Sequence, residues 1–449
     1  MTTSCLHCGA GLPAGAGFCP ACGKPAAASS QEWGAPGATP AGRRWPGSGP
    51  HLAWVVLAVT VGVAVTGLLL AAFAVSGLKP RALVGNPTEY FVFAFLQGAV
   101  FVLLIRLADV YEREPLGLVA LLALWGATGA IMLGVLGNVT VAKLLPARIE
   151  TVFGAAISAP LVEETAKGVA LLVVVLGSRW LAGRLGTLEF EGVTDGIVYG
   201  AAIGMGFALV EDLAYFLKYT VEKGPATGFY VFAHRVDLFS PNLLGHSLYT
   251  AAFGAGLGLA TVSRSRRARI GFPLLGLAAA MLMHATWNGL VQLVLVRRFG
   301  FDAAYAYLSE QLPRGALSLQ MDAASEQASR AVRLLYWGFL VACAVAFVLW
   351  LRYQRQVLRY ELAEEVRLGV VTPRDWDLLP SPRARVTQGL GLLRAGRFEE
   401  WSAVRRLQNE AVELAFLKWR LRRLGGDWSQ VDRRRQRIAR LRAEVTAPG

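Results

Sequence analysis

The sequence predicts an all-α polytopic membrane protein of about eight transmembrane helices, preceded by a small zinc ribbon and followed by a helical cytosolic tail. Of its 449 residues, 54% are hydrophobic and only 17% are charged, which is too apolar for a soluble domain of this length. The hydrophobic residues fall into runs of about 20, the length of a helix that crosses a bilayer. We therefore expect lipid to surround most of the chain.

The first predicted element is a zinc ribbon at residues 1–25. Cys5, Cys8, Cys19 and Cys22 form two Cys-x-x-Cys pairs, each followed by a glycine that permits a tight turn. Four thiolates at this spacing can hold one tetrahedral zinc ion. Because sulfur would fill all four positions, we expect a structural and not a catalytic zinc, and reduced thiols place the N-terminus in the cytosol.

The expected transmembrane domain covers residues 51–351, after a flexible linker at residues 26–50 that is rich in Ala, Gly, Pro and Ser. Its predicted spans are residues 52–75, 90–107, 116–141, 152–177, 192–217, 243–262, 271–296 and 333–351. An even number of spans returns the C-terminus to the cytosol, and the basic loop at residues 263–269 then lies inside, as the positive-inside rule requires. We expect a multi-pass protein of the inner (cytoplasmic) membrane.

Residues 352–449 form the expected basic tail. Breaks at VVTPRDW, PSPRAR and LGGDW divide it into helix-like segments. The chain has 45 basic and 31 acidic residues, a formal net charge of +14, and much of the excess lies in this tail. We ascribe the excess to the positive-inside rule, expect the lipid bilayer as a partner, and expect no nucleic-acid partner.

Polar side chains inside the predicted spans are the candidates for a functional site, because a membrane helix carries such groups only when something offsets their cost of about 2.5 kcal/mol or more each. They occur on four successive spans: Glu163, Glu164, Lys167, Glu211, His246, His284 and Asn288. Glu163 and Lys167 share a helix face, whereas Glu163 and Glu164 diverge by about 100°. One glutamate can therefore face a cavity while the other contacts a neighbouring helix. Asn138 begins an Asn-Val-Thr sequon, which we discount because it lies within a predicted span.

The residue types suggest hydrolysis of an amide. A carboxylate between apolar walls suits a general base that deprotonates water, and Glu164 and Lys167 would support Glu163 and tune its basicity. His284 and Asn288, one turn apart, would donate to the oxyanion of a tetrahedral intermediate. The same groups could instead hold a metal, since two histidines and a glutamate form a familiar catalytic zinc set with an open position for water.

The ordered motifs APLVEETAKG, DGIVYGAAIGMGFALVEDLAY, GHSLYTAAFGAGLG and MHATWNG resemble the PrsW family of bacterial intramembrane proteases over roughly residues 90–300. This family is distantly related to CAAX prenyl proteases and bacteriocin-processing enzymes. Its EExxK pattern falls on Glu163, Glu164 and Lys167, its FxxxE pattern ends at Glu211, and its two histidine motifs fall on His246 and His284.

The CAAX-type relatives form an oxyanion hole from a histidine and an asparagine four residues later, to which His284 and Asn288 are similar. They carry FxxxH where this chain has Phe207 and Glu211. The resemblance thus implies that His246 supplies the missing imidazole and that Glu211 and His246 position the water or a metal.

The resemblance implies a peptide hydrolase that cleaves a membrane-anchored protein, in some members an anti-sigma factor, as the first cut of a signalling cascade. We favour a glutamate-activated water over a metal because the sequence contains no HExxH. The metal-dependent version with Glu and His ligands is the alternative. A non-catalytic scaffold or proton-coupled carrier is a further alternative, because intramembrane carboxylates and histidines also form proton relays.

Overall fold

The computed structural model describes most of the chain after residue 113. The described residues are 114–185, 190–236 and 244–446, with the isolated positions 3–4, 11–12, 98, 100–101 and 111. The cysteines of the expected zinc ribbon and nearly all of the first two expected spans lie outside these residues. Near the N-terminus, β1 (Thr3–Ser4) and β2 (Gly11–Leu12) form an antiparallel pair.

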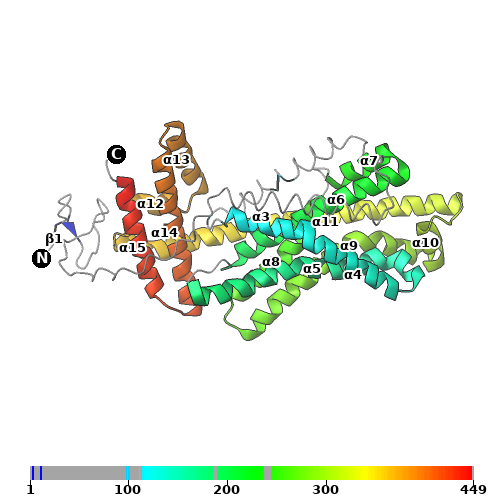
Figure 1. The fold of residues 1–449 in the computed structure, drawn as a ribbon, viewed down its shortest axis with the longest axis horizontal. Helices are drawn as coiled ribbons and strands as arrows, with labels where there is room; N and C mark the ends of the chain where they lie inside the picture. Colours follow the sequence, from blue (N-terminus) through cyan, green and yellow to red (C-terminus); the bar gives the residue numbers. More distant parts are fainter. Residues whose placement is uncertain are drawn as a thin grey trace. The chain divides into compact units, whose positions relative to one another are not determined.

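The chain divides into two compact units. The membrane unit consists of Gly49–Asp109 and Glu114–Ala342, and the terminal unit consists of Met1–Ser48, Val110–Arg113 and Cys343–Gly449. Among the described residues, the helices of the membrane unit are α3 (Leu116–Trp125), the π-helix η2 (Gly126–Ala130), α4 (Ile131–Leu144), α5 (Ala147–Leu185), α6 (Val193–Lys223), α7 (Pro225–Val236), α8 (Gly245–Thr261), α9 (Arg266–Phe299), α10 (Phe301–Leu308) and the first part of α11 (Ala316–Arg367) (Figure 1).

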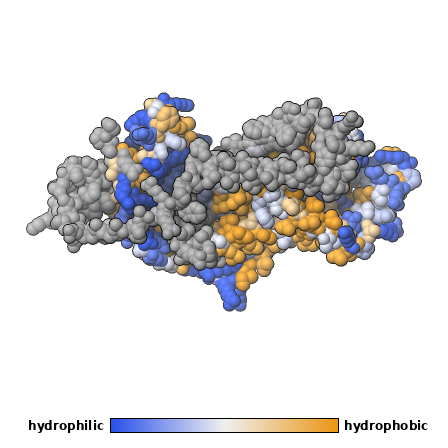
Figure 2. Space-filling view, in the orientation of Figure 1, coloured by the Kyte–Doolittle hydropathy of each residue, from blue (hydrophilic) through white to orange (hydrophobic). Residues whose placement is uncertain are grey.

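Four described helical segments are long and apolar enough to cross a membrane, and they match four of the predicted spans. These are Leu116–Leu144, Val193–Lys223, Arg266–Phe299 and Ala316–Arg367. The predicted span at residues 152–177 lies within α5, and α8 covers residues 245–261 of the span predicted at 243–262. Figure 2 shows hydrophobic side chains gathered over the region of α4, α5 and α9, where large apolar residues such as Leu136, Val173 and Leu275 are exposed. This surface is suited to lipid.

Helix α6 is the centre of the membrane unit, with 78% of its most apolar stretch buried. It packs on α8 through Gly196, Gly200 and Gly204, where an added Cβ would lie 2.0–2.4 Å from backbone oxygens of α8. Glycine is required here because any larger residue would push the two backbones apart. This close approach brings the start of α8, with His246, against the middle of α6.

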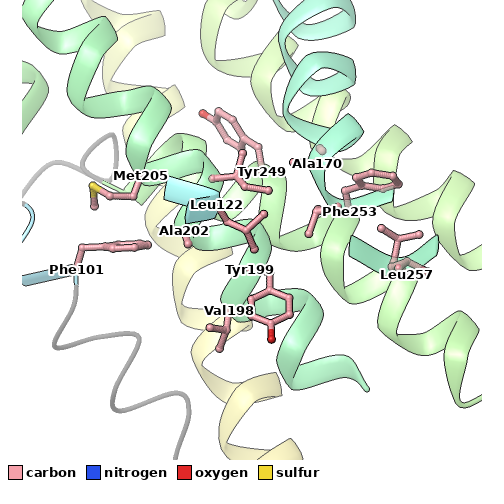
Figure 3. Close-up of a cluster of buried hydrophobic side chains, with 14 of the residues drawn as sticks. Phe101, Leu122, Ala170, Val198, Tyr199, Ala202, Met205, Tyr249, Phe253 and Leu257 are labelled. Carbon is pink, nitrogen blue, oxygen red and sulfur yellow. The ribbon is translucent and has the colours of Figure 1, made fainter. Parts of the chain in front are cut away.

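A hydrophobic cluster fills the space between α3, α6 and α8. Leu122, Tyr199, Met205, Tyr249 and Phe253 are among its buried members (Figure 3). The π-helix η2 continues this contact, because a Cβ on its first residue, a glycine, would lie 1.9 Å from a backbone oxygen of α6. Such π-helical segments are common next to functional sites, and this one sets the direction of α4.

The terminal unit contains the end of α11 and four further helices. These are α12 (Pro373–Leu378), α13 (Pro382–Arg394), α14 (Phe398–Leu424) and α15 (Ser429–Thr446). The breaks in the sequence predicted the boundaries before α12, α13 and α15 but not the one between α13 and α14. Thr372 caps α12 in a capping box with Asp375, and Ser381 caps α13. In the core of this unit Lys418 is fully buried and donates to Glu364 at 2.8 Å and to Glu365 at 2.6 Å.

Candidate active site

Three buried charges on α5 form the base of the site. Glu163, Glu164 and Lys167 are 5%, 1% and 0% exposed. Adjacent helical residues point about 100° apart, so the two carboxylates reach different neighbours. Glu164 faces α8 and α9, whereas Glu163 faces a cavity, which is the division of roles that their spacing predicted.

Both carboxylate oxygens of Glu164 have hydrogen-bond partners. Its Oε1 accepts from Lys167 Nζ at 2.8 Å and lies 3.0 Å from His284 Nδ1, and its Oε2 accepts from the Thr250 hydroxyl at 3.2 Å. Because an ionised carboxylate only accepts, the Nδ1 atom of His284 must carry a hydrogen. Glu164 therefore joins three helices and turns the Nε2 atom of His284 away from itself.

Lys167 connects the two carboxylates to His246. Its ammonium lies 3.7 Å from Glu163 Oε2, 2.9 Å from His246 Nδ1 and 3.7 Å from the centre of the Phe207 ring. An ammonium has only donors, so His246 accepts at Nδ1 and carries its hydrogen on Nε2. That hydrogen is donated to Glu211 Oε2, at 2.8 Å.

Arg235 of α7 joins this network through Glu211. It donates to Glu211 Oε2 and to Asp212 Oδ1, both at 2.5 Å, and it lies over the ring of Tyr215 at 4.3 Å. The sequence analysis predicts a role for Glu211 but none for Arg235, which lies outside the predicted spans. Its guanidinium holds Glu211 against His246.

The two histidine rings lie in a T-shaped arrangement at the centre of the site. Their centroids are 5.1 Å apart at an angle of 90°, and Tyr249 stacks on His284 at 5.1 Å. His284 Nε2 lies 4.0 Å from Glu163 Oε2. One nitrogen of His284 thus faces Glu164 and the other faces Glu163.

Glu163 has one carboxylate oxygen that is bonded and one that is not. Asn138 Nδ2 of α4 donates to Oε1 at 3.1 Å. Oε2 is buried and has no hydrogen-bond partner among the described residues. Glu163 also lines a cavity of about 350 Å³ between α4, α5, α6, α7, α8 and α9, and this volume lies within the usual range for ligand pockets. The polar and aromatic residues lining it are Asn138, Glu150, Ser158, Glu163, Glu211, Tyr215, Arg235, His246, Tyr249, His284, Trp287 and Asn288.

The site contains a donor set that fits a metal ion. Glu163, His246 and His284 each offer one ligand atom, and these atoms all lie within 4.8 Å of one another. A glutamate and two histidines are ordinary zinc ligands that leave a position open, and the Oε2 atom of Glu163 lacks a partner in the described chain. Glu164 also holds His284 as carboxylates hold metal-ligating histidines. To ligate a metal, His246 would give up one of its two hydrogen bonds.

The charges near this donor set are unequal. Four carboxylates, those of Glu163, Glu164, Glu211 and Asp212, surround two cations, Lys167 and Arg235. Buried charges of one sign must be offset by bound protons or by a cation. A divalent metal ion has the charge that would balance the set.

Asn288 makes a contact that its spacing along α9 did not suggest. It lines the cavity, but its Nδ2 donates to the backbone oxygen of Ala155 on α5 at 3.0 Å. One of its two amide hydrogens is thereby used to hold α9 on α5. The close packing of Gly289 against Ala156 beside it, where an added Cβ would lie 2.6 Å from the alanine Cβ, explains this contact.

Comparison with known proteins finds a match to a protein family. No curated protein and no solved structure matches the chain. Residues 114–309, which carry every residue of the site just described, match the model of a family described as PrsW family intramembrane metalloprotease, so this part of the chain is similar to a family of membrane-embedded peptidases.

Proposed function

We propose that this protein is an intramembrane endopeptidase that cleaves a membrane-anchored protein by attack of water on a peptide bond. The observation that carries the proposal is the unpartnered Oε2 atom of Glu163, which is buried beside a polar cavity inside a bundle of apolar helices. The match to a membrane peptidase family over the same residues supports it.

Glu163 is the proposed general base. As the water oxygen attacks the carbonyl carbon, one water proton moves to Glu163 Oε2 and the carbonyl electron pair moves onto oxygen. Lys167, 3.7 Å from the same oxygen, keeps the carboxylate from binding its proton too tightly. Glu164 holds Lys167 and His284 in place, which is a supporting role.

His284 and Asn288 are proposed to stabilise the oxyanion. Because Nδ1 of His284 donates to Glu164, donation to the oxyanion from Nε2 requires a hydrogen on that nitrogen as well. Asn288 contributes its second amide hydrogen. Glu211 and His246 are proposed to position the water from the other side of the cavity.

The metal-dependent version of the same reaction is the second candidate. The excess of carboxylates and the description of the matched family both favour it. Glu163, His246 and His284 would hold the ion, which would activate water and polarise the carbonyl. In this version Nε2 of His284 would carry no hydrogen, because it would ligate the ion. The oxyanion role, in contrast, requires a hydrogen on Nε2.

The remaining proposals concern the surroundings of the site. We propose a structural zinc on the four cysteines of residues 1–25, a linker at residues 26–50, a protease domain at residues 51–351, and cytosolic termini in the inner membrane. An anti-sigma factor is the substrate that the family resemblance suggests. The helical tail at residues 352–449 would lie near the anionic inner leaflet.

The test is cleavage of a single-span reporter protein in proteoliposomes, with wild type beside Glu163→Gln. Glu163→Gln keeps the shape of the side chain and removes the base, so we expect uncleaved reporter to accumulate. Normal cleavage by this variant would exclude Glu163 as the base. Metal content by elemental analysis, with and without chelator, separates the two versions: loss of cleavage together with a lost metal supports the metal-dependent one. No cleavage by the wild type, with proton flux across the vesicles, would favour a carrier.

A further inference from the structure

We propose that Asn138 is a catalytic residue that holds the attacking water beside Glu163. The inference rests on the proposed peptidase function and assigns a role to a residue on α4, a helix on which the sequence had marked no site residue. Asn138 lines the cavity, and its Nδ2 donates to Glu163 Oε1 at 3.1 Å. Because Oε1 is held by this contact, the other carboxylate oxygen, Oε2, is left for the attacking water.

Each member of this hydrogen-bonded pair has one buried acceptor that lacks a donor. Asn138 Oδ1 and Glu163 Oε2 both have no hydrogen-bond partner in the described part of the chain. The orientation of the amide is determined, because only its NH2 group can donate to a carboxylate. A buried acceptor without a donor costs about 1–3 kcal/mol, so each of the two acceptors is expected to meet a donor in the working enzyme.

The side chains around the pair do not supply this donor. Lys167 Nζ and His284 Nε2 lie 3.7 Å and 4.0 Å from Glu163 Oε2, which is too far for a hydrogen bond. The donor must therefore come from the cavity. A peptide N–H would satisfy one acceptor, whereas a water molecule has two O–H groups and satisfies both.

Glycines on α4 bring Asn138 to this position. A Cβ on Gly134 would lie 3.4 Å from the Cγ of Glu163, and one on Gly137 would lie 2.3 Å from the Cγ1 of Val162. These two glycines lie one turn and one residue before Asn138, so they let α4 approach α5 closely beside the asparagine. The amide is thus held by the packing of α4 on α5.

Asn138 would act by directing the lone pairs of the water. With one hydrogen bonded to Asn138 Oδ1 and the other to Glu163 Oε2, the oxygen of the water presents its electrons to the cavity. The new C–O bond forms from that oxygen, the proton on the Glu163 side moves to Oε2, and the carbonyl electron pair moves onto oxygen. The hydrogen bond to Asn138 persists through the step.

The test uses the full chain in proteoliposomes with the single-span reporter. Asn138→Leu keeps the size of the side chain and removes both polar atoms, so we expect kcat to fall about 100-fold with KM changed less than about threefold. Asn138→Ala leaves a space, and added formamide is expected to restore part of its rate. Thr140→Val is the matched control on the same helix, because Thr140 is exposed and its hydroxyl donates to the backbone of Leu136 at 2.8 Å.

Each outcome decides the proposal. A kcat for Asn138→Leu within about threefold of wild type, or a loss confined to KM, would overturn it. If Asn138→Leu unfolds, the formamide response of Asn138→Ala decides, since a merely structural asparagine gives no rescue. If the wild type is active, Glu163→Gln is inactive and Asn138→Leu is fully active, only the role of Asn138 is rejected. If the wild type is inactive, the peptidase function itself is rejected.

Discussion

Lys167 Nζ lies 2.9 Å from His246 Nδ1, and this contact assigns the hydrogens across the whole site. The imidazole must accept from the ammonium, so its Nε2 hydrogen is donated to Glu211. The ammonium meanwhile neutralises Glu164 at 2.8 Å. One buried cation thus determines both a tautomer and the charge of a carboxylate.

Replacement of Lys167 is therefore expected to damage stability as well as activity. Lys167→Met keeps much of the volume but leaves Glu164 as a buried, uncompensated charge, which typically costs about 3–5 kcal/mol. Thermal unfolding of the detergent-solubilised protein measures this loss. Lys143→Met is the control, because Lys143 is exposed at the end of α4, and an equal effect of both substitutions would contradict the prediction.

Glu163→Gln and Glu164→Gln should differ although the residues are adjacent. Glu163 Oε2 has no hydrogen-bond partner in the described chain, so Glu163→Gln should lose cleavage but unfold within a few degrees of wild type. Glu164 accepts from Lys167, His284 and Thr250, so Glu164→Gln should lose about 3 kcal/mol or more. Melting curves of both variants, read beside reporter cleavage, check this; equal melting temperatures would count against it.

The sequence predicted the residues that gather at the site better than the contacts they make. Glu163, Glu164, Lys167, His246 and His284 were all marked, because a charged or imidazole group in an apolar helix must find a partner. Helical spacing also predicted that the two glutamates face different neighbours.

The contacts that the sequence did not predict depend on how helices approach one another. Arg235 lies outside the predicted spans, where an arginine is ordinary, and its partners Glu211 and Asp212 are set by the packing of α7 on α6. Asn138 was discounted as a sequon, although an amide inside an apolar helix was itself a signal. The bond from Asn288 to Ala155 follows from the packing of α9 on α5. Spacing along one helix carries no information about how α7 packs on α6 or α9 packs on α5.

The glycine contact between α6 and α8 should be sensitive to a single methyl group. A Cβ on Gly204 would lie 2.2 Å from the backbone oxygen of His246, so Gly204→Ala must displace the helix that carries this histidine. We expect a loss of about 1–3 kcal/mol and reduced cleavage. Gly338→Ala on α11 is the control, because a Cβ there meets nothing within 4 Å, and it should be neutral or stabilising by about 0.5–1 kcal/mol. Unfolding temperatures of the pair measure the difference, and a neutral Gly204→Ala would show that the helices can separate freely.

Arg235 should be replaceable by lysine only in part. Its guanidinium donates from two nitrogens to two carboxylates, Glu211 and Asp212, whereas an ammonium is a point charge that cannot reproduce this fork. Arg235→Gln removes the charge and should release Glu211 from His246, so we expect reporter cleavage to fall about tenfold or more, with Arg235→Lys between it and wild type. Asp212→Asn leaves the contact between Arg235 and Glu211 in place, so reporter cleavage should fall less than in Arg235→Gln. Equal losses in Arg235→Lys and Arg235→Gln would mean that the paired geometry, and not the charge, is what Glu211 requires, while unchanged cleavage in both would remove Arg235 from the site.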